Sequence, residues 1–148
     1  MPTVRFLDVD NKKKFSKFFV LNDLLNINIQ VADKAVINIK EGKKTWFPYL
    51  AIIDKKTGGW KQPNEEIDWI NIPSPDNCII TQIPLSPPKK DNLTEKDVFA
   101  VFVCKEKTKK SNVYEFFGIF QFSQMNNGFR VWTRKKSVLD IEDWKIKK

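Results

Sequence analysis

The sequence contains no histidine, and this absence excludes more function classes than any other feature of the chain. Histidine is the usual general base near neutral pH and the commonest metal ligand in proteins. Without it the chain cannot form a Ser-His-Asp or Cys-His catalytic arrangement, or a zinc site that uses imidazole. Thr57-Gly58-Gly59 lacks the spacing of a P-loop or a dinucleotide fingerprint, so the sequence does not predict a nucleotide-hydrolysing or dehydrogenase site.

Cysteine and long apolar runs are also scarce. Cys78 and Cys104 are too few and too far apart for a disulfide scaffold or a zinc ribbon, so we expect two reduced thiols. No stretch approaches the roughly 18 uncharged apolar residues of a membrane span, and residues 1–10 lack the apolar segment of a signal peptide. We therefore expect a cytoplasmic protein with no membrane partner and no cofactor.

The composition is basic and aromatic. Among 148 residues there are 26 Lys and Arg against 18 Asp and Glu, a net charge of +8, and residues 101–148 alone carry 11 basic and 5 acidic side chains. Segregated positive charge favours a polyanionic partner such as nucleic acid. The 12 Phe and 5 Trp exclude a disordered chain, and the length predicts a single domain over residues 1–148.

The apolar pattern predicts mostly strands. Apolar residues recur at helical spacing only over residues 12–26, behind Asp10 and Asn11 as candidate caps. Asn126-Asn127-Gly128 separates two β-like runs and predicts a hairpin. These elements favour an α+β fold built on a small curved, mostly antiparallel β-barrel with Pro-rich loops. The predicted strands lie at 3–9, 27–31, 35–39, 45–53, 67–72, 78–83, 98–104, 113–122 and 129–134.

The second strand of this hairpin carries the candidate nucleic-acid interface. Alternation along a strand places Arg130, Trp132, Arg134 and Lys136 on one face, where cationic and aromatic side chains would contact phosphates and stack on a base. A solvated basic face, with the tryptophan covered, fits the same pattern. Further phosphate contacts are expected from a lysine-rich loop, and Trp46, Tyr49 and Trp60 are candidates either for the lining of a pocket or for the core. The loop lysines are Lys107, Lys109 and Lys110.

The runs 114–120 and 128–134 resemble the strand pair of SRA (SET- and RING-associated) domains, which have Tyr-Asp-Gly-Ile/Leu-Tyr followed by Phe-x-Val-Trp-x-x-x-x-Arg. Those domains belong to the PUA-like group of small barrels, many of which read modified bases. The resemblance implies a PUA-like module that receives a flipped base, in DNA rather than RNA, with Phe116 and Phe120 beside the motif glycine, Gly118. Phe117 stands where the family has Asp and cannot accept a hydrogen bond from a base.

Two other function classes remain open. A protein-interaction or inhibitor module would bind a protein partner through an exposed strand edge or an aromatic patch. A Mg²⁺-dependent nuclease would need a carboxylate and lysine site, for which Asp33 with Glu41-Gly42-Lys43 has the required order, and Asp143-Trp144-Lys145 is a second triplet. Glu41-Gly42-Lys43 also fits a hairpin turn. The favoured hypothesis is a non-catalytic nucleic-acid-binding module.

Overall fold

The computed structural model describes residues 4–27, 36–53, 56–61, 69–85, 95–105, 113–124 and 128–146, with the backbone alone at 52, 53, 60, 61 and 124. Most of these residues lie in strands. The two helical segments, η1 (Phe19–Leu24) and α1 (Ile141–Trp144), are short. The described part of the chain therefore has the expected α+β character, dominated by β-structure.

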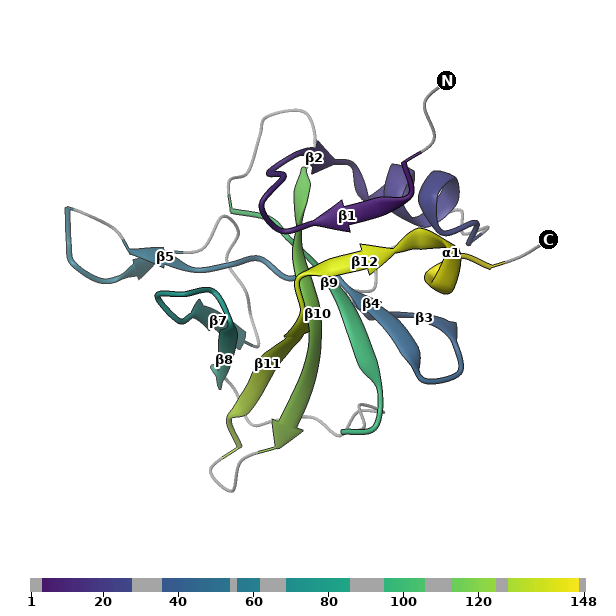
Figure 1. Cartoon of the computed structure of the whole chain (residues 1–148). Coiled ribbons are helices and arrows are strands. Elements are labelled where there is room, and N and C mark those ends of the chain that lie inside the picture. Colours follow the sequence, from purple (N-terminus) through teal and green to yellow (C-terminus); the bar gives the residue numbers. More distant parts are fainter. Residues whose placement is uncertain are drawn as a thin grey trace.

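An eight-stranded sheet forms the body of the fold, and its longest strand, β10, runs through the middle (Figure 1). The strands of its main path follow one another in the order β3 (Val36–Lys40), β4 (Lys43–Trp46), β9 (Val98–Val103), β10 (Tyr114–Gln124), β11 (Arg130–Lys136), β8 (Ile79–Pro84) and β7 (Trp69–Pro73). The eighth strand, β2 (Lys14–Phe15), pairs with the start of β10. Among the described residues β3 and β7 end the sheet without meeting, so closure into a barrel is not shown.

Two smaller sheets contain the remaining strands of the described residues. One joins β1 (Phe6–Asp8) to β12 (Val138–Asp140), and the other joins β5 (Ile52–Ile53) to β6 (Trp60–Lys61). The predicted hairpin is confirmed, because β10 and β11 pair antiparallel, although its turn at 125–127 lies outside the described residues. The predicted strand at 27–31 lies almost wholly outside them as well.

The predicted helix at 12–26 is shorter than expected. Its first residues form β2 instead, and the hydroxyl of Ser16 accepts a hydrogen bond from the N–H of Phe19, so Ser16 and not Asp10 or Asn11 caps the first turn. From Phe19 to Leu24 the helix is a wider π-helix, and at its end the N–H of Leu25 donates to the carbonyl of Val20, five residues back. The expectation failed because apolar spacing does not show that pairing with a distant strand competes for the same residues.

The sheet has a hydrophobic cluster on each face. Alternate residues of β9 enter opposite clusters: Phe102 joins the one that contains η1, β12 and α1, and Phe99 and Val101 join the other. This confirms β9 as a central strand buried on both sides. Cys104, just beyond it, is buried, whereas Cys78 is partly exposed, and the two are not joined by a disulfide.

A β-bulge in β10 changes which residues share a face. The pairing with β9 passes from Phe116 opposite Phe102 to Gly118 opposite Val101, so Phe117 is the extra residue. Phe116 therefore belongs to the first cluster, while Phe117 and the later aromatic residues of β10 belong to the second.

Candidate nucleic-acid interface

Arg130, Trp132 and Arg134 share one face of β11, as strand geometry predicts, but the expectation that this face is exposed is wrong. Trp132 is 1% exposed and Arg130 is 6% exposed. The Trp132 ring stacks on Trp46 with centroids 4.1 Å apart, and its Nε1 donates a hydrogen bond to Oε1 of Gln82 at 2.7 Å. The face is buried because the sheet's second hydrophobic cluster covers it. Trp132 fills the core and does not present its ring to a nucleotide.

Arg134, by contrast, is only partly buried and lies over β10 in a fixed position. Its guanidinium carbon is 5.2 Å from the ring centroid of Phe117 and 5.5 Å from that of Phe120. The two rings stack on each other, and Nη2 of Arg134 donates a hydrogen bond to the carbonyl of Phe117 at 2.5 Å. A cation over aromatic rings is stabilised by their electron-rich faces. This side chain is therefore pre-organised.

Gly118 makes the arrangement possible. Its φ of +124° is one that residues with a side chain rarely adopt, and a Cβ built on it would lie 2.7 Å from Nε of Arg134. We did not single out this contact from the sequence. A lone glycine inside an apolar strand is nevertheless a known sign that another group approaches the backbone closely.

No carboxylate pairs with Arg134 within the described ranges. The ion pairs found there use other basic side chains: Arg5 with Asp140, Lys44 with Asp97, Lys105 with Glu115, and Lys145 with Glu142. Lys135 and Lys136 follow Arg134 and are exposed, as expected for Lys136. The end of β11 therefore presents positive charge.

The positive charge of Arg134 acts on one carboxylate, that of Asp76 in the turn between β7 and β8. The hydroxyl of Ser74 and the N–H of Cys78 donate hydrogen bonds to Asp76, and these bonds, with a smaller contribution from the charge of Arg134, hold the pKa of Asp76 below its usual value. A charged guanidinium near a carboxyl group is expected to lower the pKa of that group, as it does here.

Arg130 belongs to a buried polar row that the sequence did not reveal. Arg130 pairs with Gln82 across β11 and β8, and Gln82 pairs with Asn71 across β8 and β7. The guanidinium carbon of Arg130 lies 4.5 Å from the ring centroid of Trp69, and all three members of the row are buried. Buried polar groups require hydrogen-bond partners. The row could be predicted only from the pairing of the three strands.

The structure does not assemble the predicted base pocket. Phe120 and Trp46 lie in the second hydrophobic cluster, whereas Phe116 lies in the first, and Tyr49 packs against that first cluster. The expectation that Phe116 and Phe120 line one pocket is therefore wrong, because the bulge sends them to opposite faces of the sheet. The side chain of Trp60 lies outside the described residues.

The remaining lysine and carboxylate candidates are only partly placed. Lys107, Lys109, Lys110 and Asp33 lie outside the described residues. Glu41 and Gly42 form the turn between β3 and β4, with Gly42 at φ +76°, and Lys43 is the first residue of β4. In the part of the chain that is described, no three His, Cys, Asp or Glu side chains are grouped so that they could hold a metal ion.

Among the described residues, no helix has the length and apolar character needed to cross a membrane. No known protein family matches the sequence, and no curated protein does. Among solved structures, the chain is similar to the 5-hydroxymethylcytosine-specific restriction enzyme AbaSI, with a TM-score of 0.62 and 17% sequence identity. The similarity covers 91% of this chain but only 42% of that enzyme. At this identity it shows a shared fold, found in part of a longer protein.

Proposed function

We propose that this chain is a DNA-binding module that reads a modified base and has no catalytic role of its own. The observation that carries the proposal is the fold shared with part of AbaSI, which is described as specific for 5-hydroxymethylcytosine. The residues that resemble the SRA strand pair form β10 and β11, at the centre of this fold. A likeness in sequence pattern and a likeness in fold thus support the same class of protein.

Phosphate contacts come from the positive end of β11 in this proposal. Arg134 is held by two aromatic rings and a backbone carbonyl, and no carboxylate of the described residues neutralises it. A guanidinium whose conformation is already fixed loses little entropy when it binds a phosphate. Lys136, Lys107, Lys109 and Lys110 add phosphate contacts. Because Trp46, Phe120 and Trp132 pack on one another, we assign them to the support of this surface rather than to stacking on a base.

The test is binding to three DNA duplexes that differ at one cytosine, which is unmodified, methylated or hydroxymethylated. Fluorescence anisotropy would measure affinity at about 50 and 200 mM salt, a range over which several phosphate contacts weaken binding strongly. We expect tighter binding to one modified duplex and a steep salt dependence. Equal affinity for all three duplexes would contradict base reading, and no binding at low salt would contradict DNA binding altogether.

The non-catalytic part of the proposal needs its own measurement. The same duplexes are incubated with Mg²⁺ and separated on a denaturing gel. We expect intact strands, since Glu41 and Gly42 form the turn between β3 and β4 and the described residues contain no group of three His, Cys, Asp or Glu side chains that could hold a metal ion. Cleavage that disappears in the variant Glu41→Gln would overturn this part and favour the nuclease.

A further inference from the structure

Among the described residues, the strand β1 pairs with a single neighbour, β12, along one of its edges. At the two ends of its pairing with β12, the N–H of Ile141 donates to the carbonyl of Arg5 at 2.8 Å, and the N–H of Val9 donates to the carbonyl of Ser137 at 3.1 Å. In an antiparallel ladder, residues alternate between those that bond to the neighbouring strand and those that point away from it. Arg5 and Val9 bond to β12, so Leu7, midway between them, does so as well.

The backbone groups of Phe6 and Asp8 therefore point away from β12. The carbonyl of Asp8 is used locally, because it accepts a hydrogen bond from the N–H of Asn11. The N–H and carbonyl of Phe6 and the N–H of Asp8 have no partner in the described part of the chain. Two unpaired donors and an acceptor on a strand edge are the groups to which another strand can bind.

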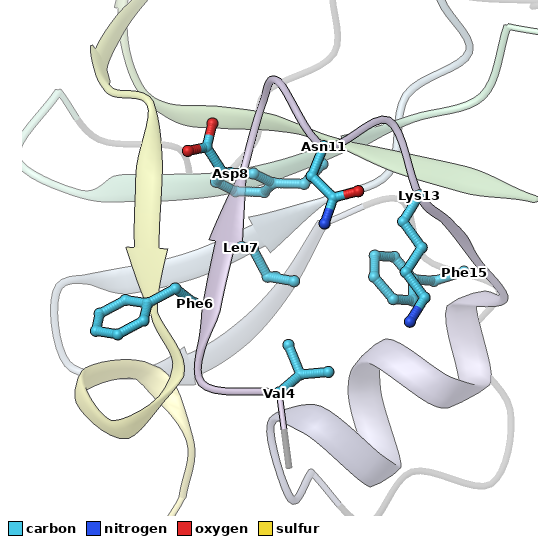
Figure 2. A pocket seen from close by; sticks show the side chains of 8 residues that line it. Val4, Phe6, Leu7, Asp8, Asn11, Lys13 and Phe15 are labelled. Carbon is cyan, nitrogen blue, oxygen red and sulfur yellow. The ribbon is translucent and has the colours of Figure 1, made fainter. Parts of the chain in front are cut away.

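A small cavity lies along this free edge, between β1 and the segment that leads into β2. Figure 2 shows the side chains of Val4 and Leu7 turned toward it from one side, and those of Lys13 and Phe15 from the other. It offers about 60 Å³ of space, several times the roughly 10–15 Å³ that one water molecule requires. The volume suits one small apolar side chain, and it is far below the roughly 300–1,000 Å³ of pockets that enclose a whole small molecule.

The segment that faces β1 across the cavity forms a rim with exposed lysines, and a large apolar side chain lies exposed beside it. Lys12, Lys13 and Lys14 are exposed on this rim; Lys13 lines the cavity from there, and Asp8 lines it from β1. Phe6 is 55% exposed. Charge complementarity therefore favours an acidic partner at this edge.

We propose that the free edge of β1 binds an extended, acidic peptide segment of a protein partner. The segment adds as a strand: its backbone pairs with Phe6 and Asp8, one small apolar side chain enters the cavity, and its carboxylates face the lysines on the rim. A polypeptide fits better than a nucleic acid, since backbone amides complement both the donors and the acceptor of the edge and the cavity is too small for a base. This site is independent of the proposed DNA surface on β11.

The probe is the blocked peptide acetyl-Glu-Val-Thr-Val-Thr-Glu-amide, titrated into ¹⁵N-labelled full chain. We expect saturable shifts of the Phe6 and Asp8 amide signals and slower hydrogen exchange at both. The same peptide with lysine in place of glutamate should bind more weakly. A peptide N-methylated at alternate residues, which removes the amide donors of one edge, should not bind.

Two protein variants test the cavity and the rim separately. Val4→Phe should fill the cavity and weaken binding about tenfold, while Leu85→Phe, at an exposed apolar residue that does not line the cavity, should not. Lys13→Glu should weaken binding about threefold, while the same charge change at the exposed Lys96, which does not line the cavity, should not. Peptide affinity that is unchanged in both Val4→Phe and Lys13→Glu would overturn the proposal. So would oligo(dT) shifting the Phe6 and Asp8 amides at lower concentrations than the peptide, which would make this edge a nucleic-acid surface.

Discussion

The predicted role of Arg134 in DNA binding can be tested by a single substitution. Its guanidinium carries the charge, contacts the two aromatic rings and donates a hydrogen bond to the carbonyl of Phe117. We expect Arg134→Ala to weaken DNA binding about tenfold, roughly 1.4 kcal/mol, and to reduce the salt slope by about one. Fluorescence anisotropy at several salt concentrations measures both quantities. Arg5→Ala is the matched control, because Arg5 is already paired with Asp140, and equal losses in both variants would contradict a specific role for Arg134.

We expect substitutions of Gly118 and Arg134 to have non-additive effects on the unfolding free energy. Gly118→Ala places a methyl group 2.7 Å from Nε of Arg134 at a backbone angle that alanine tolerates poorly, so we expect a loss of about 1–3 kcal/mol of unfolding free energy and weaker DNA binding. In Gly118→Ala/Arg134→Ala the clash is relieved, and the double variant should lose less stability than the sum of the single variants. Urea unfolding provides the comparison. Additive losses would show that the two residues are not in contact.

Trp132 should matter for stability and not for recognition. Trp132→Ala removes a fully buried ring together with its stack on Trp46 and its bond to Gln82, so we expect a loss of about 3–5 kcal/mol in denaturant unfolding. Trp132→Phe keeps an aromatic ring and should lose less. If Trp132→Ala kept the stability of the parent protein and still abolished DNA binding, the ring would be accessible to nucleotides, contrary to its burial.

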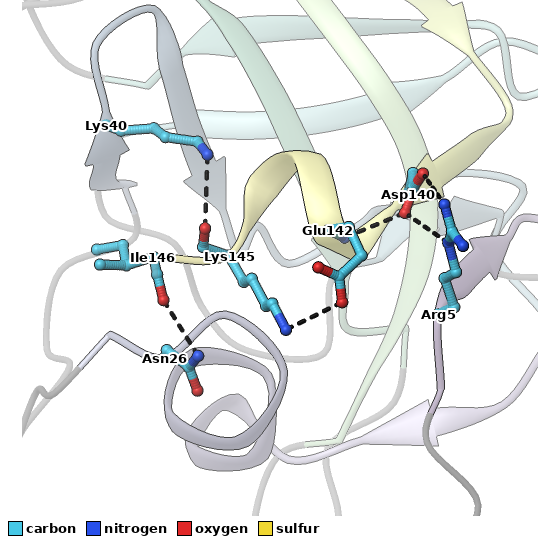
Figure 3. A network of polar contacts seen from close by, with 7 residues as sticks. All are labelled: Arg5, Asn26, Lys40, Asp140, Glu142, Lys145 and Ile146. Atoms are coloured by element: carbon cyan, nitrogen blue, oxygen red, sulfur yellow. Dashed lines mark hydrogen bonds and ion pairs between the residues drawn. The ribbon is translucent and has the colours of Figure 1, made fainter. Parts of the chain in front are cut away.

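At the scale of elements, the two ends of the described chain are joined by polar contacts (Figure 3). Arg5, before β1, pairs with Asp140 of β12 at 3.3 Å. Asn26, after η1, donates from Nδ2 to the carbonyl of Ile146 at 3.1 Å, and the N–H of Ile146 donates to the carbonyl of Leu25. The first and last segments thus stabilise each other.

This arrangement predicts a dependence of stability on pH. The hydrogen bond from Arg5, and then the N–H of Glu142, lower the pKa of Asp140 below its usual value of about 3.9. A carboxylate whose pKa is lowered by folding adds stability above its unfolded pKa, and this contribution is lost as the pH falls through the folded pKa. We expect the stability advantage of the parent protein over Asp140→Asn to be constant from about pH 5 to 7 and to shrink below about pH 4.

Asp140→Asn is a suitable substitution, because asparagine keeps an oxygen for the N-cap of α1 while it removes the charge and one of the two oxygens that accept from Arg5. Thermal unfolding between pH 3 and 7 provides the measurement. Arg5→Gln should remove the same pH-dependent component, and the double variant should lose no more than either single variant. A stability difference that did not change with pH would show that the pair contributes nothing to folding.

At the scale of the whole molecule, the main sheet draws strands from both halves of the sequence. β7 and β8 precede Pro87 and Pro88 in the sequence and β9, β10 and β11 follow them, yet β8 pairs with β11 in one sheet. Separate unfolding of the two halves would break that pairing. We therefore expect a single urea transition, with the same midpoint by tryptophan fluorescence and by far-ultraviolet circular dichroism. Two separated midpoints would mean that the halves unfold independently.

The sequence alone was sufficient for the local features. Alternation and continuous apolar runs predicted β9, β10 and β11, because a strand's side-chain period is set by its own backbone, and the Asn-Asn-Gly motif predicted the hairpin. The positive charge of the C-terminal part followed from composition. These features depend on residues close together in the chain.

Only the tertiary structure decided which faces are buried. Period two placed Arg130, Trp132 and Arg134 together but could not show that a hydrophobic cluster covers them, since burial depends on segments far away in sequence such as Trp46 and Phe99. One bulge at Phe117 separated two aromatic residues that regular alternation would have kept together. The free edge of β1 likewise depends on which strand pairs with it and which does not. Pairing partners and packing surfaces arise from contacts between distant segments, and local sequence patterns do not specify them.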